Sequence, residues 1–254
     1  MNKINVVDNK IIPFDNTDVI LNNNIITFTN NGDYYLEYIT SNNVNITINV
    51  EDNVCVQLFE YSNNNDINTN ITYNLGKNSS LIISKFYYND NTNEEINIYL
   101  NKKNANIKYN FSSISKNHDN YLINIYHNDS TTNSDIFNRT IAKENSSNNF
   151  DINSYVENKI LDCYLNQSTK IITLGDSNNK INPNMFTHDN SVTAIHASVI
   201  GNVNEEELFY LMSRGISYNE AIKIIIKGII LSNINPNMEY RGKILNILEE
   251  VGGE

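Results

Sequence analysis

The sequence predicts a mainly β protein that ends in a helical domain, and two observations support this. Between residues 24 and 200, short runs of β-branched and aromatic residues recur roughly every ten residues, separated by Asn, Asp, Ser and Gly clusters. From Glu205 onward the apolar residues recur at helical spacing, as in Leu208, Leu211 and Met212. We therefore expect an irregular N-terminal arm over residues 1–22, a β core over 23–201 and a helical domain over 202–254.

The β core consists of many short strands. We expect strands at residues 25–29, 34–39, 44–50, 54–61, 71–75, 81–88, 96–100, 106–110, 121–127, 150–156, 160–165, 171–174 and 192–198. This spacing is typical of a sandwich, a barrel or a β-solenoid, and the residues alone do not choose among them. Tight hairpin turns are scarce, with one clear case at Asn31-Gly32, and this mildly favours a solenoid. The abundant asparagines indicate either ladders at solenoid corners or a composition bias of the genome.

Capping signals mark the helices. Asn204 with Glu207 and Ser217 with Glu220 each pair a side-chain acceptor with a carboxylate three residues later, which predicts helices over 205–213 and 218–232. A third helix is expected to start with Asn235-Pro236. The second helix is apolar almost all round, so it packs either in the core of its own domain or against a partner.

The composition excludes several classes of protein. The formal charge is −11, with 29 acidic and 18 basic residues, and this argues against binding to nucleic-acid backbones. No secretory signal or membrane span is evident, so we expect a cytoplasmic protein. Two cysteines are too few for a disulfide framework or a four-cysteine metal site within one chain.

His196 and Cys163 are the candidate chemical groups. His196 alternates with apolar neighbours in a strand of small residues, a pattern that fits a hydrogen-bonded core histidine better than a metal ligand. Cys163 alternates as a buried strand residue does. The pattern leaves open a Cys163–His196 pair, and the sequence contains no phosphate-binding loop, GxSxG, HExxH or CxxC motif.

Three segments carry a family resemblance. They are HASVIG at 196–201, EELFYLMSRGI at 206–216, and QSTKIITL at 167–174. Together with Pro183 and the segment 132–139, they resemble the C-terminal signature of the SufB/SufD family of the Suf machinery for iron–sulfur cluster assembly. The resemblance covers about residues 127–230.

The resemblance implies a right-handed parallel β-helix with a C-terminal helical domain that docks on a SufC-like ABC-type ATPase. It also implies that the β-helix pairs with a SufB-like subunit or with itself. The residues expected to dock the ATPase are Leu208, Phe209, Tyr210, Arg214, Gly215, Ile222 and Ile226.

The resemblance also bears on the type of subunit. The strand of SufB-type proteins reads Glu-His-Glu and follows a strand with a sulfur-accepting cysteine, whereas here His196 lacks both carboxylates and Thr169 stands near that cysteine's position. SufD-type strands read Cys-x-His-Gly-Ala, and here Ala194 takes the cysteine position. The chain is therefore more similar to SufD, with His196 as the candidate iron or cluster ligand and Cys163 as a weak one.

We accordingly expect a non-enzymatic scaffold subunit of a SufBCD-type complex, with no tightly bound cofactor and a transient iron–sulfur cluster at a subunit interface. Three alternatives stay open. The first is a divergent SufB-like scaffold of a minimal SufBC system, and the second is a purely structural subunit without a ligand. The third, from another class, is a β-solenoid enzyme acting on polysaccharide through paired carboxylates.

Overall fold

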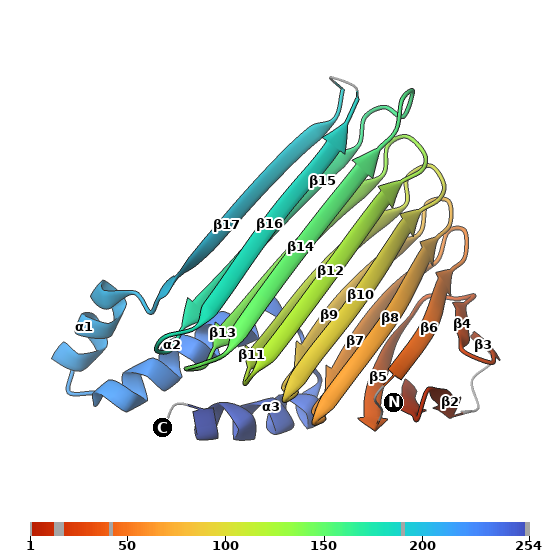
Figure 1. The fold of residues 1–254 in the computed structure, drawn as a ribbon. Coiled ribbons are helices and arrows are strands. Elements are labelled where there is room, and N and C mark those ends of the chain that lie inside the picture. The colour runs from red at the N-terminus through yellow and green to blue at the C-terminus, as the bar shows by residue number, and fades with distance from the viewer. Residues whose placement is uncertain (1, 13–17, 41–42, 189–190, 252–254) are drawn as a thin grey trace.

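The computed structural model describes residues 2–12, 18–40, 43–188 and 191–251. They form a β-solenoid whose coils each contribute one strand to each of two facing sheets, followed by three helices at one side (Figure 1). Every strand pair between successive coils is parallel. This confirms the prediction of a parallel β-helix core with C-terminal helices.

The two sheets alternate along the chain. Sheet A contains, in spatial order, β17 (Thr193–Asn202), β15 (Tyr164–Thr173), β13 (Asn133–Ala142), β11 (Asn106–Ser115), β9 (Ser80–Tyr87), β7 (Cys55–Ser62), β5 (Gly32–Thr40), β1 (Asn2–Val7) and β2 (Lys10–Ile12). Sheet B contains β16 (Asn178–Thr187), β14 (Ser147–Val156), β12 (His118–His127), β10 (Asn91–Leu100), β8 (Asp66–Leu75), β6 (Asn43–Val50), β4 (Ile25–Phe28) and β3 (Val19–Asn22). Residues 1–22, predicted as an irregular arm, thus contain the strands β1, β2 and β3.

Alternate side chains of each strand point into the solenoid, where equivalent residues of successive coils stack. In sheet B, Ile46, Ile71, Ile96, Ile123 and Ile152 are Cα partners from coil to coil, and all are buried. Such in-register columns bury the β-branched residues without hairpins, which is why tight turn signals are scarce.

A column of asparagines forms one corner of the solenoid. Asn53, Asn78 and Asn104 have positive φ angles of 64°, 54° and 60°. The Asn78 amide donates to the Asn53 side-chain oxygen at 2.9 Å, and the Asn104 amide donates to that of Asn78 at 2.9 Å. Asn tolerates the left-handed backbone and its amide both donates and accepts, so at this corner the ladder explanation for the asparagines is correct.

The interior of the solenoid also holds charged groups. The Lys85 ammonium lies 2.5 Å from a Glu94 oxygen and 3.4 Å from a Glu60 oxygen, and all three side chains are fully buried. Tyr38 donates to Glu60 at 2.9 Å and Tyr87 donates to Glu94 at 3.0 Å. Hydrogen bonds from neighbouring coils thus surround this ion cluster, as buried charges require.

Asp119 lies one strand further along the interior. Asp119 is 2% exposed, and burial raises its pKa from 3.8 to about 6, although hydrogen bonding from Thr92 opposes this shift. Thr92 is its Cα partner on the neighbouring strand β10. The position therefore disfavours the ionised form relative to an exposed carboxyl group.

The helices are α1 (Glu205–Ser213), α2 (Tyr218–Asn233) and α3 (Met238–Val251). Asn204 accepts hydrogen bonds from the backbone N–H groups of residues 206 and 207, and Ser217 with Glu220 forms a complete capping box, so the first two predicted starts are confirmed. The third is wrong. The α3 helix begins at Met238, two residues later than predicted, because Asn237 rather than Asn235 caps it: the Asn237 side chain accepts from the Tyr240 N–H at 2.9 Å.

The α2 and α3 helices cover the solvent side of sheet A. Ile225, Ile226 and Ile230 belong to a buried cluster that includes Phe86 and Ile141 of the sheet. The Asn233 amide donates to the Phe111 carbonyl at 2.7 Å and to the Phe137 carbonyl at 3.3 Å. The apolar circumference of α2 is therefore used mainly in the core of its own domain.

Candidate functional site

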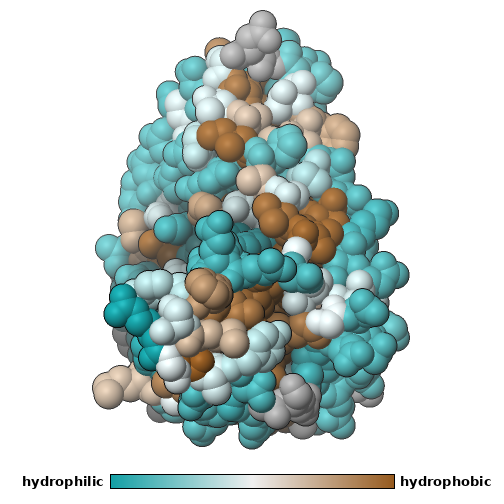
Figure 2. Space-filling model, turned by 90° about the vertical axis from the view of Figure 1, so that its left-hand side faces the viewer, coloured by the Kyte–Doolittle hydropathy of each residue, from teal (hydrophilic) through white to brown (hydrophobic). Residues whose placement is uncertain are grey.

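The last coil leaves one end of the solenoid uncovered. In the part of the chain that the structure describes, β16 and β17 are the outermost strands of sheets B and A, and nothing packs beyond them (Figure 1). Ile195, Val199 and Ile200 on β17 are 48%, 52% and 46% exposed. Figure 2 faces this end and shows hydrophobic patches between hydrophilic areas. A sheet end with exposed apolar residues is typical of an interaction surface.

His196 lies in the middle of this end. It is the Cα partner of Gln167 on β15, a buried residue whose side chain points into the solenoid, so His196 lies above the interior rather than on the outer face. It is exposed because no further coil covers it among the residues that the structure describes. The alternation of the strand correctly placed His196 on the inward face. The prediction of a core histidine is wrong, because His196 is exposed at the end of the solenoid.

Polar side chains lie beneath His196. The Gln167 amide donates to the Ser154 hydroxyl at 2.9 Å and to the Asn184 carbonyl at 3.2 Å, whereas its Oε1 atom has no hydrogen-bond partner among the described residues. Thr169, near the position of the cysteine in SufB-type proteins, points into the same interior and accepts from the Asn138 amide at 3.0 Å. The open end is thus lined by neutral hydrogen-bonding groups, which sequence reasoning missed. The sequence signal that could have revealed these groups is the polar residues at inward positions of the strand 164–173.

The described residues do not complete a metal site here. Within the described residues, no three His, Cys, Asp or Glu side chains gather in an arrangement that could hold a metal ion. His196 offers one imidazole, which is a suitable ligand for iron but not sufficient alone.

Cys163 is not paired with His196. Its side chain is 2% exposed and packs with Val156 and Leu165 at a corner of the solenoid. Its sulfur lies 3.3 Å from the Thr132 hydroxyl, which lies 2.8 Å from Nδ1 of His127. His127 is buried, and burial lowers its pKa from 6.5 to about 4. The histidine near Cys163 is therefore His127, held neutral between Thr132 and Ser134.

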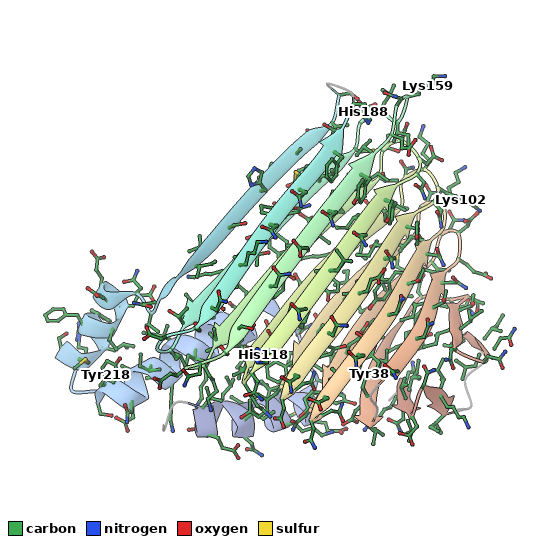
Figure 3. The ribbon with its side chains drawn as sticks, in the orientation of Figure 1. Tyr38, Lys102, His118, Lys159, His188 and Tyr218 are labelled. Atoms are coloured by element: carbon green, nitrogen blue, oxygen red, sulfur yellow. The ribbon has the colours of Figure 1, made fainter. Side chains whose placement is uncertain are left out.

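The remaining histidines are far from one another. Figure 3 shows His188 at one end of the strands and His118 near the opposite end. His118 is exposed and its Nδ1 lies 2.9 Å from the Ser147 hydroxyl. Neither contributes to a cluster of ligands.

The α1 helix presents the second exposed apolar surface. Phe209 is 75% exposed, Tyr210 is 57% exposed and Met212 is 44% exposed, and the helix has no buried residue. The Arg214 guanidinium lies 5.3 Å from the centre of the Tyr210 ring, and Gly215 follows with a φ of 87°, which favours glycine. We call Phe209, Tyr210, Met212 and Arg214 the α1 patch.

A groove of about 610 Å³ separates α1 from α2. Its lining includes the apolar residues Leu211, Ile225 and Ile229 and the acidic residues Glu206 and Glu207. Leu208 is half-buried against the core of the helical domain, and Ile222 and Ile226 are 8% and 1% exposed within that core. Of the predicted docking residues, Phe209, Tyr210, Arg214 and Gly215 are therefore exposed, whereas Ile222 and Ile226 are buried in the cluster that joins the helices to sheet A.

These features define a β-solenoid protein with an uncovered end and a helical domain that offers its own contact surface. Residues 19–229 match the family described as "SUF system FeS cluster assembly, SufBD core domain". The chain belongs to this family of the iron–sulfur cluster assembly machinery, as the resemblance predicted.

Individual relatives match shorter segments. The chain is 25% identical over 134 residues to the iron–sulfur cluster assembly protein SufD of Bacillus subtilis, covering 52% of this chain and 31% of that protein. It is 47% identical over 47 residues to SufB of the same organism, covering 18% of this chain and 10% of the relative. A SufBD family protein of Pyrococcus horikoshii is 54% identical over 35 residues, covering 14% of this chain and 8% of the relative. The aligned parts thus span less than a third of each of these relatives.

No helix among the described residues has the length and apolar character needed to cross a membrane.

Proposed function

We propose that this protein is a non-enzymatic, SufD-like scaffold subunit of a cytoplasmic Suf complex. Its open solenoid end contacts a SufB-like subunit or a second copy, and its helical domain binds a SufC-like ATPase. The observation that carries the ATPase contact is the α1 patch, because its phenylalanine is 75% exposed and a group of exposed apolar side chains is typical of an interaction surface.

The exposed aromatic and arginine side chains of the α1 patch are of the types that dominate binding energy at protein interfaces. The adjacent groove offers an apolar floor to a partner helix, and its acidic margin favours a partner with basic residues. In the alternative role, as a SufB-like scaffold of a minimal SufBC system, the chain would use the same two surfaces. The absence of carboxylates beside His196 favours the SufD-like role. The polysaccharide-active alternative is not supported by the family assignment.

The docking proposal is tested by co-expression with SufC-like ATPases and co-purification on a tag on this chain. Changing Phe209 to Ala and Arg214 to Ala is expected to weaken retention of the ATPase at least tenfold. Met238 is 92% exposed at the start of α3, outside the α1 patch, and Met238→Ala is the matched control. Unchanged retention of the ATPase by both α1 variants would contradict the docking proposal.

At the solenoid end, we propose His196 as a ligand to iron or to a transient cluster, with Cys163 as a weaker candidate because its sulfur is enclosed. Anaerobic purification of the assembled complex followed by iron analysis tests this. His196→Ala is expected to lower the iron content while the subunits stay associated, and Cys163→Ser is expected to leave it unchanged. Full iron content with His196→Ala would indicate a purely structural subunit.

A further inference from the structure

We propose that the interior of the solenoid binds a water molecule between Glu94, Tyr109 and Tyr121, where it bridges three buried polar atoms that have no hydrogen-bond partner among the described residues. These residues lie on β10, β11 and β12, and in sheet A the strands β13 and β15 separate β11 from β17. The site is therefore distinct from the open end and from the α1 patch, and it does not depend on the proposed function.

The two carboxylate oxygens of Glu94 differ sharply in their hydrogen bonding. Oε1 accepts from the Thr69 hydroxyl at 2.8 Å, from the Tyr87 hydroxyl at 3.0 Å and from the Lys85 ammonium at 2.5 Å. Oε2 is buried and has no partner in the part of the chain that the structure describes. A buried carboxylate oxygen without a donor costs free energy, so this atom calls for one more hydrogen bond.

Two tyrosine hydroxyls are the unpaired donors of this region. Tyr121 is the Cα partner of Glu94 on the neighbouring strand, and Tyr109 lies on the facing sheet. The two side chains are 1% and 0% exposed, and neither hydroxyl has a partner within the described residues. Thr92 and Ser113 lie beside the Tyr121 hydroxyl and oppose the rise in its pKa that burial causes, but neither completes a hydrogen bond with it. Buried tyrosine hydroxyls normally find a partner.

The electrostatics of the interior place these donors near the unpaired acceptor. Burial raises the pKa of Tyr109, and the negative charges of Glu94 and Glu60 raise it further. Burial and the charge of Asp119 raise the pKa of Tyr121, and Glu94 adds to this shift. Glu94 therefore acts on both hydroxyls, although neither donates to it directly. Polar groups that are close without being bonded to one another are suited to a bridging molecule.

The mixture of donors and acceptor selects water as the bound molecule. A buried water typically makes about three hydrogen bonds, and here it accepts from the hydroxyls of Tyr109 and Tyr121 and donates to Oε2 of Glu94. A metal cation would use only oxygen lone pairs and would leave both hydroxyl protons without an acceptor. Moreover, among the described residues no three His, Cys, Asp or Glu side chains are arranged to hold a metal ion. The carboxylate disfavours an anion.

The bound water extends the buried ion cluster. Lys85 already lies within ion-pair distance of Glu60 and Glu94, which lie on β7 and β10. The water connects Glu94 to Tyr109 on β11 and to Tyr121 on β12. Both oxygens of the Glu94 carboxylate are then hydrogen-bonded, as a charge in a dry interior requires.

A high-resolution crystal structure of the full chain tests the site directly. An ordered water is expected at hydrogen-bonding distance, roughly 2.7–3.2 Å, from Oε2 of Glu94 and from the hydroxyls of Tyr109 and Tyr121. Direct hydrogen bonds between these groups, with no density between them, would overturn the proposal. Crystals soaked in rubidium chloride separate water from a cation, because an anomalous signal at the site would overturn the assignment as water and its absence would support it.

Removal of each hydroxyl gives a second test in solution. Tyr109→Phe and Tyr121→Phe are each expected to lower the urea midpoint of unfolding, because each removes a hydrogen bond to the water. Tyr38→Phe is the matched control, since the Tyr38 hydroxyl donates directly to Glu60 at 2.9 Å and its loss should shift the midpoint in the same direction. Without a water, the two hydroxyls are unsatisfied and their removal raises the midpoint, a result that would overturn the proposal.

The double variant tests whether the two hydroxyls share one water. Tyr109→Phe combined with Tyr121→Phe is expected to lower the urea midpoint by less than the sum of the two single shifts, because the first substitution already weakens the binding of the water that both hydroxyls contact. Strictly additive shifts would contradict a shared site.

Discussion

Replacing Asp119 with Asn is expected to stabilise the protein at neutral pH. Burial raises the pKa of Asp119 from 3.8 to about 6, so folding at pH 7 requires an ionised carboxylate in an unfavourable site or uptake of a proton. The difference of about two in pKa, at roughly 1.4 kcal/mol each, corresponds to about 3 kcal/mol. Because the folded-state pKa is raised, this group favours the folded state fully below about pH 4, and that contribution is lost as the pH rises through 6.

The assay is urea unfolding of the wild type and Asp119→Asn at several pH values from 4 to 8. The amide is neutral at every pH, so the gain in unfolding free energy is expected to be near zero at pH 4 and to approach about 3 kcal/mol at pH 8. Leu122 is a half-buried residue of the same strand, and Leu122→Met serves as a control whose effect should not vary with pH. A stability difference between Asp119→Asn and the wild type that is constant over this range would refute the reasoning.

Two further predictions concern buried groups. Lys85→Met leaves the carboxylates of Glu60 and Glu94 buried without their cation and is expected to lower the free energy of unfolding in urea by about 3–5 kcal/mol. Adding Glu60→Gln and Glu94→Gln should recover most of this loss. No recovery would contradict the assigned ion cluster. The depressed pKa of His127, about 4 against 6.5, predicts that its contribution to stability is constant above pH 6.5 and that up to about 3 kcal/mol is lost as the pH falls towards 4. His127→Gln should flatten this part of the stability profile, which thermal melts at pH 4 to 7 would reveal.

The sequence predicted the β core well where the interior is apolar. The strands around Ile71, Ile96 and Ile123 were found because their inward positions hold β-branched residues. Strands β13 and β16 were missed as complete strands because their inward positions include Asn138 and Pro183, which interrupt the apolar period. Residues 160–165 and 171–174, expected as two strands, contain the ends of one strand, β15, because the polar inward residues between them concealed its continuity.

The candidate site was only partly predictable for a different reason. Periodicity assigns His196 to the inward face of a strand, but it cannot show that no coil follows. The same limit applies to α2, where Ile222 and Ile226 are as apolar as an interface requires and are in fact covered by the chain's own sheet. The family signature identified the helical segment, whereas only the packing separated its exposed residues from its buried ones.

The short connection between β17 and α1 has a mechanical consequence. Only Val203 and Asn204 separate the strand from the helix, and within sheet A the strand is held by β15 on one side alone (Figure 1). A displacement of α1 away from the sheet would therefore load the hydrogen bonds of β17 at its Asn202 end first. In such a movement the first strand to respond would be the one that carries His196.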